Sequence, residues 1–294
     1  MRGLRHGPMD PSYLVLASAE DPVASRVLER WGTLESTGWV VEGAPIRRLG
    51  PRALLLRRPG RHIHDEQVDL RLPSELRERR VTLVFPSMHR SERNVECLTV
   101  HPLGNPGPSA EVGGRPRMLV PTDPRRMTAV LRRLSEGGRD LSLAATFEAT
   151  HHGPEVALPA FFVEIGYGTA DAPPEGAVRL LAEVLPDIEP DRGDRVALGV
   201  GGGHYVPHFT DLARRRRWAF GHLLSRHAIE TLDAVTARAA WIGTDGAEGI
   251  LYSRAEDAAH PVFRELGPRL RDRDAPARSN GPDPTVASRS ASGT

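Results

Sequence analysis

Short apolar runs alternate with amphipathic stretches along most of this chain. Residues 13–18 (YLVLAS) are apolar at almost every position, which predicts a buried strand. Asp21 and Pro22 then supply an N-cap residue and a proline for the first helical turn, so we expect a helix that continues to about Trp31. The chain thus opens with a strand that is followed by a helix.

The same order of elements recurs downstream. We expect further strands at residues 81–85, 141–147, 160–165 and 196–200, and helices from Asp123 through Leu134, over 176–185, and from Thr210 past Trp218. Strands that are apolar on both faces and alternate with helices are typical of a mainly parallel sheet covered by helices. The predicted fold class is therefore α/β, with a single domain over residues 12–270.

The two ends of the chain have a different composition. Residues 271–294 are rich in Arg, Asp, Pro, Ser, Gly and Ala and have no apolar periodicity. Such a segment cannot bury enough apolar surface to offset its ordering entropy, so we expect a disordered tail. Residues 1–11 are similar and are expected to be flexible.

Composition narrows the class of protein. The 294 residues are 39% apolar, which is ample for a buried core, and the formal charge of +1 means that an anionic partner must be bound by a local patch. The single cysteine, Cys97, excludes a disulfide scaffold and a multi-cysteine zinc module. The apolar run near the start is too short for a signal peptide or a membrane span. We therefore expect a cytoplasmic protein that does not enter a membrane.

Four unusual polar segments follow the predicted strands directly. They are residues 86–105, 148–154, 164–166 and 201–210. Ligands of open α/β sheets bind at the carboxyl ends of the strands, so we expect these segments to converge in space.

The first segment contains His89 and Glu92 in an HxxE spacing, which lets an imidazole and a carboxylate approach one metal ion. A surface helix produces the same spacing by chance, but histidines also occur in the other segments. The candidates to complete a metal site are His101, His151, His152 and His204. Because the chain has one cysteine, the available zinc site is one built from histidines and carboxylates, with an open position for water.

Two carboxylates stand at strand ends, where burial requires a partner. Glu148 is the first choice for a general base because it precedes the histidine pair, and Glu164 is the second. The ordinary alternative is a salt bridge to an arginine. Adjacent residues point in different directions, so we expect His151 and His152 not to bind the same ion, and either ring could simply be packed or solvated.

A triple glycine, Gly201, Gly202 and Gly203, precedes His204, and its amides could approach a phosphate or an oxyanion. The alternative is a tight turn. Arginines 214–217 followed by Trp218, together with Arg125, Arg126, Arg132 and Arg133, form two basic stretches that could contact RNA. Most such runs are solvated helix faces, and we find no RNA-module motif.

The motifs HRSE, LTVHPLGN, TFEATHHGP, VEIG and GGGHYVPHFT closely resemble the archaeal and plant type of D-aminoacyl-tRNA deacylase, in order over roughly residues 14–252. The resemblance implies a zinc-dependent enzyme that removes D-amino acids from tRNA, with a fold similar to those of nucleoside phosphorylases and peptidyl-tRNA hydrolase. By position it implies these site residues: His89, Glu92, His101, Glu148, His151, His152, Glu164, Gly201, Gly202, Gly203, His204 and Tyr205. Residues 93–97 (RNVEC) depart from the expected Ser-Gly-Ile-Pro-Ser.

The resulting hypothesis is hydrolysis of an aminoacyl-tRNA ester by a monomer or small homo-oligomer. Zinc on His89, Glu92 and His204 would supply hydroxide, with Glu148 moving the proton and His151 or His152 protonating the ribose oxygen. The glycine amides and Tyr205 would face the oxyanion or a phosphate. Three alternatives stay open: a metallo-carboxypeptidase-like amidohydrolase or esterase on a small substrate, a non-catalytic tRNA-binding module, and a phosphorylase.

Overall fold

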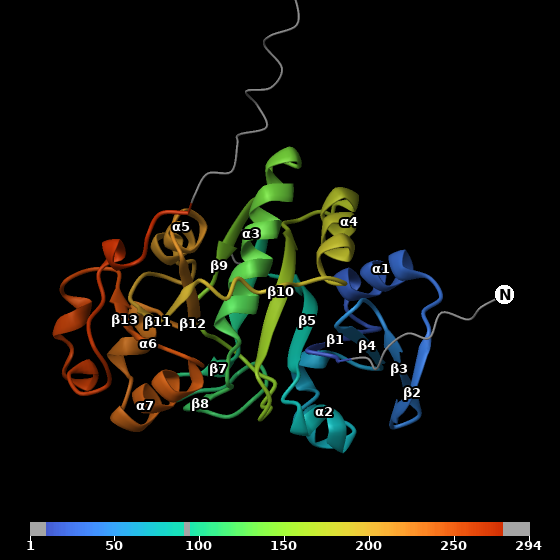
Figure 1. Cartoon of the computed structure of the whole chain (residues 1–294), viewed down its shortest axis with the longest axis horizontal. Helices are drawn as coiled ribbons and strands as arrows, with labels where there is room; N and C mark the ends of the chain where they lie inside the picture. Colours follow the sequence, from blue (N-terminus) through green and yellow to red (C-terminus); the bar gives the residue numbers. More distant parts are fainter. Residues whose placement is uncertain (1–9, 91–94, 279–294) are drawn as a thin grey trace, which may run out of the picture.

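The computed structural model describes residues 10–90 and 95–278 (Figure 1). In this part of the chain an eight-stranded sheet has the order β2-β3-β4-β1-β5-β10-β6-β9. Its strands are β1 Tyr13–Ser18, β2 Ser36–Val41, β3 Ala44–Arg48, β4 Ala53–Arg58, β5 Thr82–His89, β6 Glu96–Pro102, β9 Ala144–Phe147 and β10 Ala160–Tyr167. Strands β4, β1, β5 and β10 run parallel to one another, and β9 is parallel to β6. The antiparallel pairs are β2 with β3, β3 with β4, and β6 with β10. The predicted α/β fold with a mainly parallel sheet is confirmed.

A second, fully parallel sheet has the order β12-β11-β13. Its strands are β11 Arg195–Val200, β12 Trp218–Leu224 and β13 Gly249–Tyr252, and a small ribbon pairs β7 Gly104–Asn105 with β8 Met118–Leu119. The helices are α1 Pro22–Trp31, α2 Ser74–Glu78, α3 Pro124–Asp140, α4 Glu175–Val184, α5 Pro207–Arg215, α6 Arg226–Glu230 and α7 Ala234–Gly243. Short 3-10 turns are η1 His62–His64, η2 Val68–Arg71, η3 Asp257–Ala259, η4 Pro261–Phe263 and η5 Asp272–Asp274.

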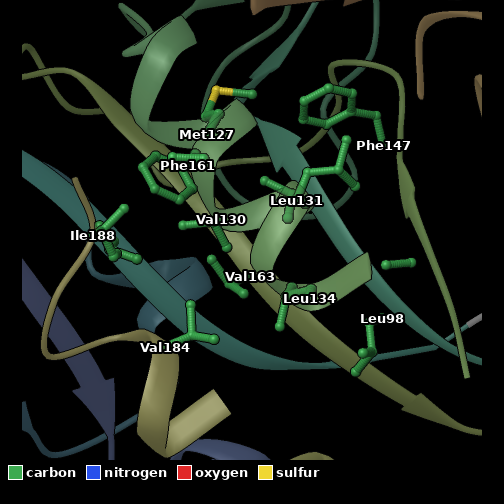
Figure 2. Packing of buried hydrophobic residues seen from close by; sticks show 14 of the residues in the cluster. Leu98, Met127, Val130, Leu131, Leu134, Phe147, Phe161, Val163, Val184 and Ile188 are labelled. Atoms are coloured by element: carbon green, nitrogen blue, oxygen red, sulfur yellow. The ribbon is translucent and has the colours of Figure 1, made fainter. Parts of the chain in front are cut away.

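Helix α3 connects the two sheets. It begins where the Asp123 carboxylate accepts a hydrogen bond from the amide of Arg126, as the Asp-Pro pair predicts. Its apolar face packs on β6 and β9 of the main sheet and on β12 of the small one. Figure 2 shows Met127 and Leu131 of this helix beside Phe161 and Phe147, and one core cluster includes residues of both sheets. Any site at the carboxyl ends of these strands is therefore assembled from two sheets.

Two sequence predictions about the C-terminal part are wrong. The helix expected from Thr210 past Trp218 is α5, which ends at Arg215, and the fully buried Trp218 begins strand β12. The apolar run that Trp218 opens is long enough to form a buried strand, and this burial outweighs the local helical pattern.

The predicted disorder from Arg271 onward is also wrong for residues 271–278. Ala275 is fully buried, and the amide of Arg217 donates to the carbonyl of Pro276 over 3.1 Å. Residues 279–294, and residues 1–9 of the predicted flexible start, lie outside the described residues. Within the described ranges no helix is long and apolar enough to cross a membrane.

Candidate active site

A cavity of about 470 Å³ opens at the carboxyl ends of β4 and β5. Its walls come from five stretches: the turn η1, the end of β5, residues 111–112, the histidine pair 151–152, and His204. Glu164 of β10 lies at its base, and the carboxylate of Glu148 lies within 4 Å of His151 and His204, both of which line the cavity. The four polar segments thus converge, as the position of strand ends in an α/β sheet predicts.

Glu148 is the most unusual group of the site. Its side chain is completely buried, and neither carboxylate oxygen has a hydrogen-bond partner within the part of the chain that the structure describes. Oε1 lies 3.4 Å from Nε2 of His89 and 3.5 Å from Nε2 of His204, and Oε2 lies 3.9 Å from Nε2 of His151. The backbone of Glu148 is fixed, because its amide donates to Val100 and its segment bridges to Tyr205. A buried carboxylate without hydrogen bonds is costly, so this position requires a cationic or hydrogen-bonding partner such as a ligand or substrate can supply.

A second carboxylate, that of Glu164, contacts two histidines of the site. Glu164 accepts a hydrogen bond from Nδ1 of His89 over 3.1 Å, and its other oxygen lies 3.7 Å from Nε2 of His101. Burial acts to raise the pKa of Glu164, but the hydrogen bonds and charges of His101 and His89 outweigh it and hold this pKa well below its ordinary value. Glu164 is therefore an ionised group that positions both histidines.

His89 links this carboxylate to the cleft. Its Nε2 lies 2.9 Å from the hydroxyl of Tyr205, so both ring nitrogens already have partners. Burial acts to lower the pKa of His89, but the hydrogen bond to Glu164 and the charges of Glu148 and Glu164 raise it. A histidine with this environment suits a proton donor better than the metal ligand that the HxxE spacing predicts. Glu92, the other half of that spacing, lies outside the described residues.

The described residues hold three groups of possible metal ligands: His101, His151 and His152; Glu148, His151 and His204; and His89, Glu148 and Glu164. The first consists of histidines alone. The Nδ1 atoms of His101, His151 and His152 lie 3.2, 2.7 and 2.7 Å from the backbone carbonyls of Pro102, Ala149 and Gly153, respectively. A carbonyl can only accept, so each Nδ1 carries the hydrogen, and the neutral rings of His151 and His152 keep a lone pair on Nε2. Nε2 of His101 instead lies 3.7 Å from Glu164; burial acts to lower the pKa of His101, but the neighbouring Glu164 carboxylate raises it. Ligand atoms of the three histidines lie within 4.8 Å of one another, as close as a shared metal ion requires. Such backbone anchoring is typical of histidine ligands.

This cluster corrects the expectation that His151 and His152 point apart. His152 has a φ of 35°, a left-handed conformation that is uncommon for a residue with a side chain, and the two rings lie 4.7 Å apart. Burial lowers the pKa of His152 to about 4, and burial together with the charges of His101 and His152 lowers that of His151 well below its ordinary value. Both rings are therefore neutral at neutral pH, which disfavours them as the predicted proton donors.

One backbone amide of the triple glycine forms a hydrogen bond within the fold. The amide of Gly201 donates to the carbonyl of Leu224 over 2.8 Å, so it does not face an oxyanion as predicted. Its φ is 104°, and a Cβ there would lie 2.1 Å from the Asp257 carboxylate, which explains the glycine. Gly202 is half-buried and Gly203 is exposed, and they lead to His204 at the cleft.

The two predicted basic stretches lie apart from the cleft. Arg126 is buried, and it binds Asp123 and the carbonyl of Ile188. Arg125 donates to the carbonyl of Asp194. In the other stretch Arg214 and Arg215 are exposed at the end of α5, but the ring of Trp218 is buried and cannot stack on a base.

The remaining members of both stretches also hold the fold together. Arg216 donates to the carbonyl of Ala275, and Arg217 pairs with Asp191. Arg132 pairs with Asp194, and Arg133 donates to the carbonyl of Val184 over 3.2 Å. These hydrogen bonds and ion pairs engage Arg125, Arg126, Arg216 and Arg217 within the fold, and RNA contacts at the two stretches stay a prediction.

Sequence reasoning missed one wall of the cleft. Arg61, His62 and His64 lie there, directly after strand β4. The run ALLLRR of this strand, followed by Pro-Gly and two histidines, has the same strand-then-polar order as the other segments. His62 is buried, and its ring stacks on that of Phe85 with the ring centroids 5.8 Å apart. Its Nδ1 has no hydrogen-bond partner among the described residues. The signal was present, because this strand is as apolar as those that were recognised.

Fold and site together define a class: an α/β enzyme with histidines and carboxylates arranged for acid–base chemistry in an open cleft. Residues 77–258 match the model of the family described as D-aminoacyl-tRNA deacylase. The D-aminoacyl-tRNA deacylase of Thermoplasma acidophilum is 33% identical over 243 residues, which cover 82% of this chain and 90% of that protein. That of Pyrococcus horikoshii is 34% identical over 212 residues, or 70% and 76% of the two chains. The chain belongs to the D-aminoacyl-tRNA deacylase family.

A solved structure supports the same fold. The crystal structure of a conserved protein of unknown function superposes with a TM-score of 0.75 at 25% identity, covering 90% of this chain and 96% of that one. The resemblance seen in the sequence motifs is confirmed by the family match and the relatives.

Proposed function

We propose that this protein hydrolyses the ester that links a D-amino acid to tRNA. The observation that carries the proposal is the buried Glu148 carboxylate beside an open cleft in a chain of this family. It has no hydrogen-bond partner among the described residues and lies 3.4–3.9 Å from three imidazole Nε2 atoms. Ester hydrolysis requires a base to activate water and an acid to protonate the leaving ribose oxygen. Both kinds of group are present within a few ångströms of each other.

The residues of the site fit a zinc ion. His101, His151 and His152 would hold it, since backbone carbonyls fix their Nδ1 atoms and the buried Nε2 of His101 has no hydrogen-bond partner among the described residues. Three histidines with an open position are a common catalytic zinc site. When bound, zinc supplies a Lewis acid that lowers the pKa of water.

The proton-transfer roles follow from the hydrogen bonds. Glu148 accepts a proton from the attacking water, because neither of its oxygens accepts a hydrogen bond from a described residue. His89, oriented by Glu164 at Nδ1, donates a proton from Nε2 to the ribose oxygen. Tyr205 holds that Nε2 until the substrate arrives. Gly202 and Gly203 provide amides for the oxyanion, and pocket shape excludes one side-chain direction and so selects the D form.

The first experiment measures release of tyrosine from matched D- and L-tyrosyl-tRNA by the purified protein. We expect rapid release of D-tyrosine alone, loss of activity on chelation, and recovery with zinc. Glu148→Gln should lower kcat at least 100-fold because it removes the base. Glu183→Gln, on the exposed face of α4, is the matched control and should retain full activity.

Other outcomes would favour the alternatives. Faster hydrolysis of D-tyrosine methyl ester than of the tRNA ester would indicate a small-substrate esterase. Binding of tRNA without release of either amino acid, unchanged in Glu148→Gln, would indicate a binding module. A requirement for phosphate without metal would indicate a phosphorylase.

A further inference from the structure

Two arginines on the rim of the cleft differ from the other basic residues near it. Arg61 follows β4 and Arg90 follows β5, and both are exposed and line the cavity that holds His151, His152 and His204. Strands β4 and β5 lie on either side of β1 and are parallel to it, so the two arginines stand at the same edge of the sheet. They therefore reach the cleft from two neighbouring strand ends.

Neither arginine forms an ion pair with a described residue. The nearby carboxylates Glu42 and Asp65 are already taken, since Arg58 pairs with both and Arg71 does the same. Arg61 is thus left with its charge directed to solvent. Within the cleft, Glu164 is paired with His89, and the Asp21 carboxylate accepts hydrogen bonds from the amides of Val23 and Met88.

The acidic residues Asp21 and Glu164 also line the cavity but are buried, so at its exposed rim the two guanidiniums face one carboxylate. Glu111 is the exposed acidic residue among those that line the cavity, against Arg61 and Arg90. His62 adds a buried imidazole at the same wall, and its Nδ1 has no hydrogen-bond partner in the part of the chain that the structure describes. A guanidinium without a carboxylate partner at the mouth of a cleft binds phosphate with a planar fork of donors.

We infer that Arg61 and Arg90 bind the phosphate backbone at the 3′ end of the substrate RNA and so place its terminal ester beside Glu148. This inference rests on the proposed function and specifies its RNA contacts. It concerns other arginines than the predicted RNA contacts, which lie apart from the cleft. The chain's near-neutral charge requires a local patch for RNA, and the rim of the catalytic cleft is where such a patch acts on the reacting end.

The test compares Arg61→Ala, Arg90→Ala and the double variant on D-tyrosyl-tRNA and on D-tyrosine methyl ester, which has no phosphate. Each single variant should raise KM for the tRNA about tenfold, with kcat and methyl-ester hydrolysis within twofold of wild type. In the double variant the slope of log kcat/KM against log salt should become less negative by about 1.4, as expected for two lost contacts to a single strand.

Arg77→Ala is the matched control. Arg77 is exposed on α2, which precedes β5, so it lies at the opposite end of a strand about 25 Å long. Removing it should change neither KM nor the salt slope. An unchanged KM and slope in the double variant would overturn the inference, as would an equal loss on the methyl ester.

Binding of uncharged tRNA separates this inference from the proposed function. The double variant should bind tRNA at least tenfold more weakly than wild type and Arg77→Ala. If the wild type bound tRNA in this way but hydrolysed no D-tyrosyl-tRNA, the proposed function would fail and the phosphate contacts would stand. Equal affinity of all variants would refute the contacts whatever the activity.

Discussion

His222, which lies away from the cleft, shows how burial changes the pKa of a single histidine. His222 of β12 is fully buried, its Nδ1 lies 3.1 Å from the Thr150 hydroxyl, and its Nε2 has no hydrogen-bond partner among the described residues. Burial lowers the pKa of His222 from 6.5 to about 3. The ring is therefore neutral in the folded protein, where it supports the segment that carries the histidine pair.

This shift predicts a pH dependence of stability. Below pH 6.5 the unfolded chain takes up a proton at His222 but the folded chain does not until about pH 3, so the free energy of unfolding falls as pH falls through this range. Between pH 7 and pH 5, wild type should lose about 2 kcal/mol more than His222→Asn, measured by urea unfolding. The asparagine can still bond to Thr150.

A buried apolar change serves as the control. Phe220→Leu, in the same strand, should lower the free energy of unfolding by the same amount at pH 5 as at pH 7. If His222→Asn kept the full pH dependence of wild type, the ring would not be neutral in the folded state.

At the scale of elements, the segment after β13 illustrates how tertiary contacts override composition. Residues 271–278 have the polar, proline-containing sequence of a disordered tail, yet Arg278 pairs with Asp191 and Asp194 and its amide donates to the carbonyl of Arg215. These contacts cover the end of α5 and the start of β12. A few buried atoms and backbone hydrogen bonds therefore order a segment that its own residues do not specify.

A pair of matched substitutions tests this docking. Ala275→Asp places a charge at a fully buried position and should lower the free energy of unfolding by about 3 kcal/mol. Ala277→Asp makes the same change two residues on, at an exposed position, and should cost less than about 0.5 kcal/mol. Equal effects in urea unfolding would show that the segment is not packed on the body.

The same contrast explains what the sequence could predict. Apolar runs with Asp-Pro signals located β1, α1, β10 and α3, because burial on both faces and helix capping are local properties. They did not reveal that residues 96–102 form β6, antiparallel to β10, since His101 and its neighbours read as a polar loop. Pairing between distant strands is not encoded in local periodicity.

The candidate site, too, was predictable only as far as local sequence determines it. Its residues were found because four motifs follow four strands, but their roles depend on hydrogen bonds that the spacing does not show. His89, an expected metal ligand, is proposed as a proton donor because both of its ring nitrogens have partners. His62 and Arg61 were missed because strand β4 was not recognised.

At the scale of the molecule, the site joins two sheets into one unit. The amide of Ala149, beside the proposed general base Glu148, donates to the carbonyl of His204 over 2.8 Å, and the amide of Thr150 donates to the carbonyl of Leu223 of β12 over 2.7 Å. The segment that carries the proposed zinc ligands His151 and His152 is thus fixed by the small sheet, whereas His101 comes from the main one. A ligand held by these histidines stabilises both sheets together.

Zinc should therefore stabilise the whole fold. At a free concentration 100 times its Kd it should add about 2.7 kcal/mol and raise Tm by roughly 5–10 °C in one transition, measured by calorimetry on metal-free protein. Magnesium, which prefers oxygen ligands, should not do so. His101→Asn should abolish the shift, whereas His227→Asn, on the exposed surface of α6, should keep it. An equal shift in both variants would place the metal elsewhere, because His101 belongs to one of the groups whose ligand atoms lie within 4.8 Å of one another and His227 to none of those in the described residues.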